Sequence, residues 1–143
     1  MSESTNPGGT LPSFRFLLDT DILIAALGED PVVLDAIARS DEVFIPATAL
    51  GELDYGAAHS ARPEQNVDRV TSLAAGQVVL GTDDRTALEY GRLKADLRRR
   101  GRPIPDNDLW IAALAVQHDL TLATRDAHFA PVTDLRIVRW ENA

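Results

Sequence analysis

Cysteine is absent from this chain of 143 residues, which excludes disulfide bonds, thiolate zinc sites and cysteine nucleophiles. Long apolar runs are absent too, since none approaches the roughly 18 residues that a membrane-spanning helix needs. Residues 1–12 contain glycine and proline but lack the apolar segment of a secretory signal, so we expect a flexible tail there. These absences predict a cytoplasmic protein in which residues 13–143 form one domain.

Basic residues are few, because 14 Lys and Arg stand against 22 Asp and Glu and give a net charge of −8. This balance argues against broad, nonspecific binding of nucleic acid, which needs a positive surface. The basic residues that do occur are concentrated in residues 92–102, where Arg98, Arg99, Arg100 and Arg102 lie close together. This run is either a helix face in contact with solvent or a surface that binds RNA or a protein partner beside the acidic motif that follows.

Strand-like and helix-like segments alternate along the chain. Short apolar runs predict strands at residues 14–18, 43–45, 78–80, 120–123 and 136–138. Helical spacing, prolines near the first turns and glycines after the last turns predict helices at residues 20–27, 31–39, 46–59, 63–75, 86–100 and 106–118. This alternation predicts an α/β fold with a mainly parallel central sheet of four or five strands, flanked by helices.

Four acidic residues fall where such a fold binds ligands, at the carboxyl ends of its strands. Asp19 follows the first predicted strand, and Asp126 follows the strand at 120–123. Asp108 lies in the first turn of the 106–118 helix, and Glu52 lies one turn into the helix after strand 43–45. If these strands are neighbours, all four carboxylates converge on one edge of the sheet.

Each acid also has a simpler structural interpretation. Asp19 is a favourable N-cap for the helix that follows it, and Asp126 could cap a short turn. Asp108 could merely complement the positive end of a helix dipole, which is worth roughly 0.3–1 kcal/mol. Glu52 fits a capping role poorly, because a capping box at this helix start would place its acid at position 51, which is Gly51.

Convergence of these acids would require a cation. Two carboxylates about 4 Å apart repel by roughly 4 kcal/mol at an effective dielectric constant near 20. Oxygen ligands without histidine or cysteine favour Mg²⁺, with Mn²⁺ as the alternative. His59, His118 and His128 show no zinc-site spacing, and we interpret them as surface or packing residues. A metal held by carboxylates suits hydrolysis of phosphodiester bonds.

Four segments carry a resemblance to a known family. They are residues 16–24, which read FLLDTDILI, residues 52–57 with 60–66 after them, residues 101–113, which read GRPIPDNDLWIAA, and residues 122–126 followed by Phe129. In order and spacing they resemble the PIN-domain nucleases, and most closely the VapC toxins of bacterial toxin–antitoxin pairs. The resemblance covers nearly all of the chain after residue 12.

This resemblance implies a ribonuclease that acts on RNA, often transfer or ribosomal RNA. It implies that Asp19 and Asp108 are the main metal ligands. Glu52 would ligate a second ion or orient the attacking water, and Asp126 would bind or polarise water at the metal. The resemblance also implies a homodimer and a VapB-type antitoxin whose tail blocks the site.

Two further acids are ambiguous. Many family members carry Asn where this chain has Asp21. The extra carboxylate could assist metal binding or only cap the helix, and we favour the cap. Asp106 and Asp108 are two residues apart, so they face directions about 200° apart on a helix and should not share one ion. From the motif, we expect Asp108 to be the ligand.

Two other functions remain open on the sequence alone. Residues 16–21 also resemble the first motif of haloacid-dehalogenase-like phosphatases, in which Asp19 would be the nucleophile. Such an enzyme also needs a lysine, and the only lysine of this chain, Lys94, lies in a basic helix without the matching motif. The chain could instead be a catalytically inactive PIN-like binding module.

Overall fold

The computed structural model describes residues 14–141, so the predicted tail at residues 1–12 lies outside the described residues. Within them, five strands form one sheet in the order β3-β2-β1-β4-β5, and every neighbouring pair is parallel. The strands are β1 (Arg15–Leu18), β2 (Glu42–Pro46), β3 (Val78–Leu80), β4 (Thr121–Ala123) and β5 (Ile137–Val138). The predicted parallel α/β sheet is confirmed.

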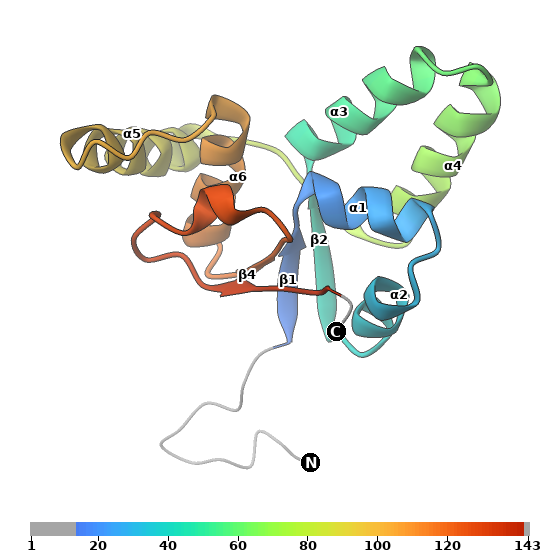
Figure 1. Ribbon diagram of the computed structural model, residues 1–143, viewed down its shortest axis with the longest axis horizontal. Helices are drawn as coiled ribbons and strands as arrows, with labels where there is room; N and C mark the ends of the chain where they lie inside the picture. The colour runs from blue at the N-terminus through green and yellow to red at the C-terminus, as the bar shows by residue number, and fades with distance from the viewer. Residues whose placement is uncertain (1–13, 142–143) are drawn as a thin grey trace.

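Helices flank this sheet (Figure 1). They are α1 (Thr20–Leu27), α2 (Pro31–Ala38), α3 (Ala47–Ala58), α4 (Pro63–Ala75), α5 (Asp84–Arg99), α6 (Asp106–Gln117) and the 3₁₀ helix η2 (Ala127–Phe129). In Figure 1, α3 and α4 form one arm at the upper right and α5 and α6 form another at the left, with β1 and β2 between them. No helix of residues 14–141 is long and apolar enough to cross a membrane.

The core lies between the sheet and these helices. Leu17 and Leu18 of β1 are fully buried, as expected for a central strand covered on both faces. In α6, Leu109 is buried and so is every residue from 111 to 115, which makes α6 the most enclosed helix. These apolar contacts fix the position of the first turn of α6, where Asp108 lies.

One edge of the sheet collects the ends that carry the predicted acids. In the register of β1 and β4, Leu18 pairs with Ala123, and the N–H of Asp19 donates to the Ala123 carbonyl at 3.0 Å. The residues after the two strands therefore start side by side. The first turn of α6 lies at this same edge of the sheet, and the helix then leads to the start of β4. Asp108, in that first turn, therefore lies close to the residues that follow β4.

Most element boundaries agree with the sequence prediction to within one residue, and the largest shift is at α5. That helix starts at Asp84, not at residue 86. Asp83 accepts hydrogen bonds from the N–H groups of Arg85 and Thr86, and its own N–H donates to the Thr86 hydroxyl. This capping box starts the helix two residues before the predicted start.

Candidate metal centre

Asp19 lies at the bottom of the acidic site and is only 4% exposed. It is the N-cap of α1, where its Oδ1 accepts the Thr20 N–H at 2.8 Å, so the expected capping contact exists. Its Oδ2 accepts the hydroxyl hydrogen of buried Thr124 at 2.8 Å. Burial, followed by the negative charges of Asp21 and Asp108, raises the pKa of Asp19 to about 7, although these hydrogen bonds oppose the change. A cap alone does not need such an environment.

Asp21 ties the start of α1 to the loop after β4. Its Oδ2 accepts the backbone N–H of Arg125 at 3.0 Å, while its Oδ1 is buried and has no hydrogen-bond partner in the described residues. Burial, and less strongly the charge of Asp126, raises the pKa of Asp21. The interpretation of Asp21 as the helix cap is wrong, because Asp19 occupies the N-cap position and Asp21 holds the loop.

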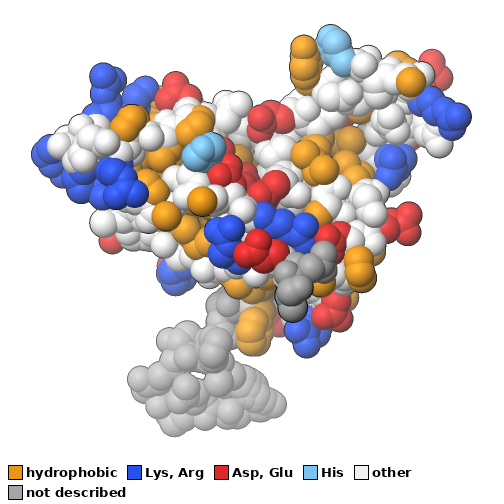
Figure 2. Space-filling view, viewed as in Figure 1, with side chains coloured by type: hydrophobic (Ala, Val, Ile, Leu, Met, Phe, Trp, Pro, Cys, Tyr) orange, Lys and Arg blue, Asp and Glu red, His pale blue; other side chains and the backbone are white. Residues whose placement is uncertain are grey.

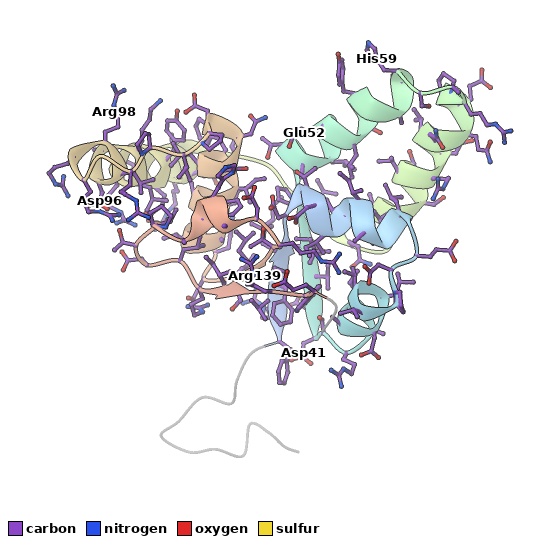
Figure 3. All side chains as sticks on the ribbon, viewed as in Figure 1. Asp41, Glu52, His59, Asp96, Arg98 and Arg139 are labelled. Atoms are coloured by element: carbon purple, nitrogen blue, oxygen red, sulfur yellow. The ribbon has the colours of Figure 1, made fainter. Side chains whose placement is uncertain are left out.

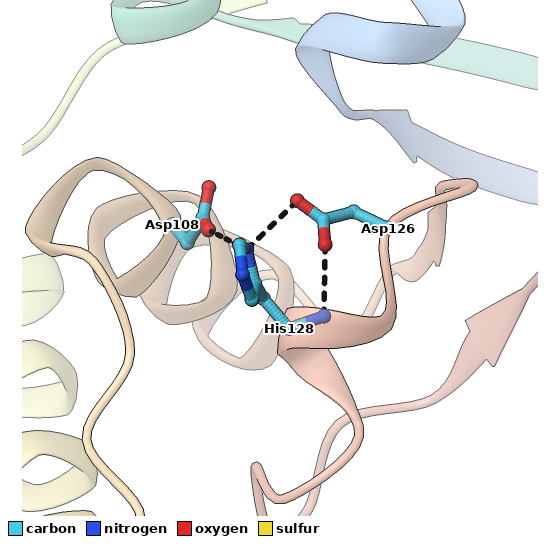
Figure 4. Close-up of side chains that lie close together, drawn as sticks. All are labelled: Asp108, Asp126 and His128. Atoms are coloured by element: carbon cyan, nitrogen blue, oxygen red, sulfur yellow. Dashed lines mark hydrogen bonds and ion pairs between the residues drawn. The ribbon is translucent and has the colours of Figure 1, made fainter.

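Asp108 and Asp126 face each other across the ring of His128 (Figure 4). Nδ1 of His128 lies 3.1 Å from Oδ2 of Asp126 and 3.5 Å from Oδ2 of Asp108. Asp126 is the N-cap of η2, and its Oδ1 accepts the His128 N–H at 2.9 Å. The three side chains offer donor atoms that all lie within 4.8 Å of one another. Burial, then the charge of Asp126, raises the pKa of Asp108.

Glu52 approaches from the opposite arm. It lies on α3, on the side that faces the space between the two arms (Figure 3). Its Oε1 accepts the Thr20 hydroxyl hydrogen at 3.0 Å, which links α3 to the start of α1. The negative charge of Glu52 contributes to the raised pKa of Asp108, so the two carboxylates interact across the hollow that Figure 2 shows between the arms.

Asp106 points away from this group, as the helical spacing predicts. Its carboxylate accepts the Tyr90 hydroxyl hydrogen at 2.9 Å and pairs with Lys94 Nζ at 3.2 Å. The hydrogen bond from Tyr90, together with the one from Lys94, lowers the pKa of Asp106. The same contact places the only lysine of the chain against Asp106, which removes the support for a phosphatase site at Asp19.

The structure divides the predicted basic run into two kinds of arginine. Arg99 and Arg100 both pair with Asp96, at 2.6 and 2.7 Å. For Arg98 and Arg102, by contrast, no ion pair with another side chain of residues 14–141 is found. Arg98 points outward from α5 in Figure 3, and Lys and Arg side chains cover this arm in Figure 2.

His128 is a surface residue, as predicted, but the sequence did not indicate that it contacts the acidic site. Its ring is 61% exposed but lies directly against two of the predicted acids. The available signal was local: Asp126 caps η2, and Phe129 is fully buried, so residue 128 has to point another way. The direction of the His128 ring toward Asp108 depends on the packing of α6 and could not be derived from the spacing of residues in the sequence.

The donor set fits a divalent metal ion. Like charges crowd around Asp108 and Asp19, and burial penalises their charged forms, so both carboxyls hold their protons more tightly than ordinary aspartates. A bound cation would reverse this effect by stabilising the ionised carboxylates. Oδ1 of Asp21, which has no hydrogen-bond partner within residues 14–141, adds one more buried acceptor near this group.

Comparison with known proteins gives one consistent result. Residues 16–135 match the PIN domain family. Ribonuclease VapC1 of Haemophilus influenzae is 30% identical over 87% of this chain and 97% of its own length. Ribonuclease VapC5 of Mycobacterium tuberculosis is 34% identical over 80% of this chain and 84% of its own. The crystal structure of DNA-bound VapBC from Salmonella typhimurium aligns with a TM-score of 0.85 at 28% identity, over 89% of this chain and 98% of that one.

Proposed function

The chain belongs to the PIN-domain family, on its VapC branch, and from this membership we propose that it is a Mg²⁺-dependent endoribonuclease, the toxin of a toxin–antitoxin pair. Residues 13–143 would form the nuclease domain, and the protein would act on cytoplasmic RNA. The substrate class that we propose is transfer or ribosomal RNA, cut at an exposed loop, because unstacked loops are where proteins reach single RNA strands.

One observation carries this proposal. Acidic side chains from α1, α3, α6 and the loop after β4 meet at one edge of the sheet, and the pKa values of the more buried ones are raised. A fold does not benefit from uncompensated like charges of this kind, since each raised pKa reports a less stable ionised form. Within residues 14–141 no Lys or Arg side chain pairs with these carboxylates, so a metal ion would supply the positive charge that they lack.

We assign the metal to Asp19, Asp108 and Asp126, with Glu52 completing the acidic group. When bound, Mg²⁺ would lower the pKa of water and compensate the charge of the phosphate. The protein itself orients these ligands: the hydroxyl of Thr124 holds Asp19, and the hydroxyl of Thr20 holds Glu52. The same Thr124 oxygen accepts the N–H of Asp126 at 2.9 Å, so one buried threonine fixes two of the acids.

The direct test is RNA cleavage by the purified protein. We expect structured transfer RNA to be cut with Mg²⁺ or Mn²⁺ and to stay intact with EDTA. Absence of cleavage with every divalent ion and a broad set of RNAs would favour the inactive binding module. Release of phosphate from an aryl phosphate, with a trapped phosphoryl group on Asp19, would favour the phosphatase.

A VapB-type antitoxin is the partner that we propose. A groove of about 470 Å³ runs between α1, α3 and α4, with Ile24, Leu53 and Val70 among its apolar lining residues. Thr20 and Glu52 also line it, so the groove opens onto the acidic site. An amphipathic antitoxin segment bound there would bury this apolar surface and reach the carboxylates. Addition of such a partner should stop cleavage.

We also propose that the toxin is a homodimer. Leu88 of α5 and Tyr55 of α3 are large apolar side chains that are 76% and 67% exposed. Exposed residues of this size are candidates for a protein interface. Sedimentation of the protein without antitoxin would measure its oligomeric state, and a monomer at micromolar concentration would contradict this part of the proposal.

A further inference from the structure

His128 has no role in the proposed reaction so far, yet its ring is the group in closest contact with two of the proposed metal ligands. Figure 4 shows the imidazole between the two carboxylates. Nδ1 is the nitrogen that faces them, at 3.1 Å from Asp126 and 3.5 Å from Asp108. Neighbouring ligands of one octahedral ion, each about 2.1 Å from it, lie about 3 Å apart. The observed spacing of the three donor atoms therefore suits a shared ion as well as it suits a hydrogen bond.

The backbone holds His128 in this position. Its N–H donates to Oδ1 of Asp126, so the residue belongs to the first turn of η2. The next residue, Phe129, is 0% exposed and anchors η2 in the core. Asp108 is fixed independently by the buried face of α6. The imidazole therefore meets the carboxylates without a rearrangement of the chain.

We propose that His128 is a nitrogen ligand of the metal ion held by Asp108 and Asp126, and that this nitrogen shifts the preference of the site from Mg²⁺ toward Mn²⁺. The inference rests on the proposed metal centre and adds to it a ligand and a selectivity. Mg²⁺ prefers oxygen ligands and retains several waters, whereas imidazole is a good ligand for transition metals. A site with two carboxylates and one imidazole should bind Mn²⁺ more tightly than a purely carboxylate site does.

Pulsed electron paramagnetic resonance of bound Mn²⁺ tests this ligand directly, because a coordinated imidazole gives a characteristic ¹⁴N coupling. The experiment uses the full chain without a polyhistidine tag, loaded with one equivalent of Mn²⁺. We expect the ¹⁴N signal in the wild type and in His59→Gln, since His59 lies at the far end of α3 (Figure 3). We expect it to disappear in His128→Gln.

Metal affinities give the second readout, measured by calorimetry at equilibrium. The His128→Gln variant should bind Mn²⁺ about tenfold more weakly or worse, as expected when a metal site loses one supporting group. Its affinity for Mg²⁺ should change by about threefold or less, because Mg²⁺ can replace the nitrogen with water. The His128→Asp variant, which offers an oxygen instead, should keep Mn²⁺ binding without the ¹⁴N signal.

Two results would overturn the inference while leaving the proposed nuclease intact. The first is Mn²⁺ binding by the wild type without any ¹⁴N coupling, and the second is a coupling that survives in His128→Gln. If the wild type binds neither Mn²⁺ nor Mg²⁺, the metal centre of the proposed function fails along with the inference. His128 is largely exposed, so its variants should fold. A wild-type spectrum without ¹⁴N coupling overturns the inference whether or not they do.

Discussion

Asp106 and Asp108 lie in the same turn of α6, yet the two carboxylates have different partners and opposite pKa shifts. Asp106 faces α5, where Tyr90 and Lys94 hold its carboxylate and lower its pKa. Asp108 faces the sheet edge, where burial and the charge of Asp126 raise its pKa. The first carboxylate is satisfied by its own protein. The second has no Lys or Arg partner within residues 14–141, and we propose a metal ion as its counter-charge.

The contrast extends to the two regions around these residues. On α5, Asp96 accepts hydrogen bonds from Arg100 and Thr133, and these contacts lower its pKa. At the sheet edge, Asp19 and Asp21 have raised pKa values, with burial as the largest cause in both. Acidic residues therefore occur in both regions, but within residues 14–141 no Lys or Arg side chain pairs with those at the sheet edge. This difference, and not the number of acids, identifies the candidate site.

The largest expected effect separates the two aspartates of α6. Asp108→Asn should lower the rate of RNA cleavage in Mg²⁺ by at least about a hundredfold, because it removes a charged ligand from the proposed metal centre. Asp106→Asn is the matched control: it changes the same kind of group two residues away and should alter the rate by about threefold or less. Both rates are measured on the same RNA at saturating Mg²⁺.

Equal rates for Asp108→Asn and the wild type would mean that the assigned site is wrong. A large loss in Asp106→Asn alone would move the metal centre to the other side of α6. Circular dichroism of both variants checks that the loss of rate does not come from unfolding. The pair therefore tests the distinction between a satisfied and an unsatisfied carboxylate.

The sequence was sufficient for the framework of this site. The predicted strands end just before Asp19 and shortly before Asp126. Parallel strands place their carboxyl ends at one edge of the sheet, so the convergence follows from topology. The spacing of Asp106 and Asp108 likewise predicts that only one of them faces the sheet. These predictions depend on periodicity and on chain order, and both can be read directly from the residues.

Contacts between residues that lie far apart in the chain could not be predicted from the sequence. Asp21 accepts a hydrogen bond from the N–H of Arg125, which is 104 residues away, and no local sequence pattern predicts that contact. The position of His128 against Asp108 depends on how α6 and η2 pack together. By contrast, the pairing of Asp96 with Arg99 and Arg100 was available from their spacing of three and four residues on a helix. The basic run was therefore less uniform than its composition suggested.

The pH dependence of folding stability should reveal the free-energy cost of ionising the buried carboxylates. Asp19 has a pKa of about 7 in the fold against an ordinary value of 3.8, so the folded protein binds more protons than the unfolded chain between these values. Stability therefore falls as the pH rises through that window and levels off above it. Thermal unfolding in EDTA should show a melting temperature that decreases from about pH 5 to pH 8.

Asp19→Asn removes the charge, so the variant should gain stability relative to the metal-free wild type as the pH rises from 5 to 8. Its melting temperature should also vary less with pH. Saturating Mg²⁺ should stabilise the wild type and leave the variant largely unchanged, because only the wild type keeps this ligand. A wild-type melting temperature that rises from pH 5 to pH 8 in EDTA would contradict the prediction.

The smallest expected effect concerns the arginines of the basic run. Arg98 and Arg102 have no ion pair within residues 14–141, whereas Arg99 and Arg100 are held by Asp96. If the run binds RNA, the unpaired arginines should make most of the phosphate contacts. Arg98→Gln with Arg102→Gln should then reduce the slope of log affinity against log salt concentration by about one to two. The matched double variant, Arg99→Gln with Arg100→Gln, should change the slope less, because those side chains are already paired. Binding is measured with Asp108→Asn in the background and without a divalent ion, so that the RNA stays intact.

An unchanged slope in Arg98→Gln with Arg102→Gln would show that the run is a solvent-exposed helix face. Equal changes in the two double variants would show that an arginine paired with Asp96 still contacts RNA.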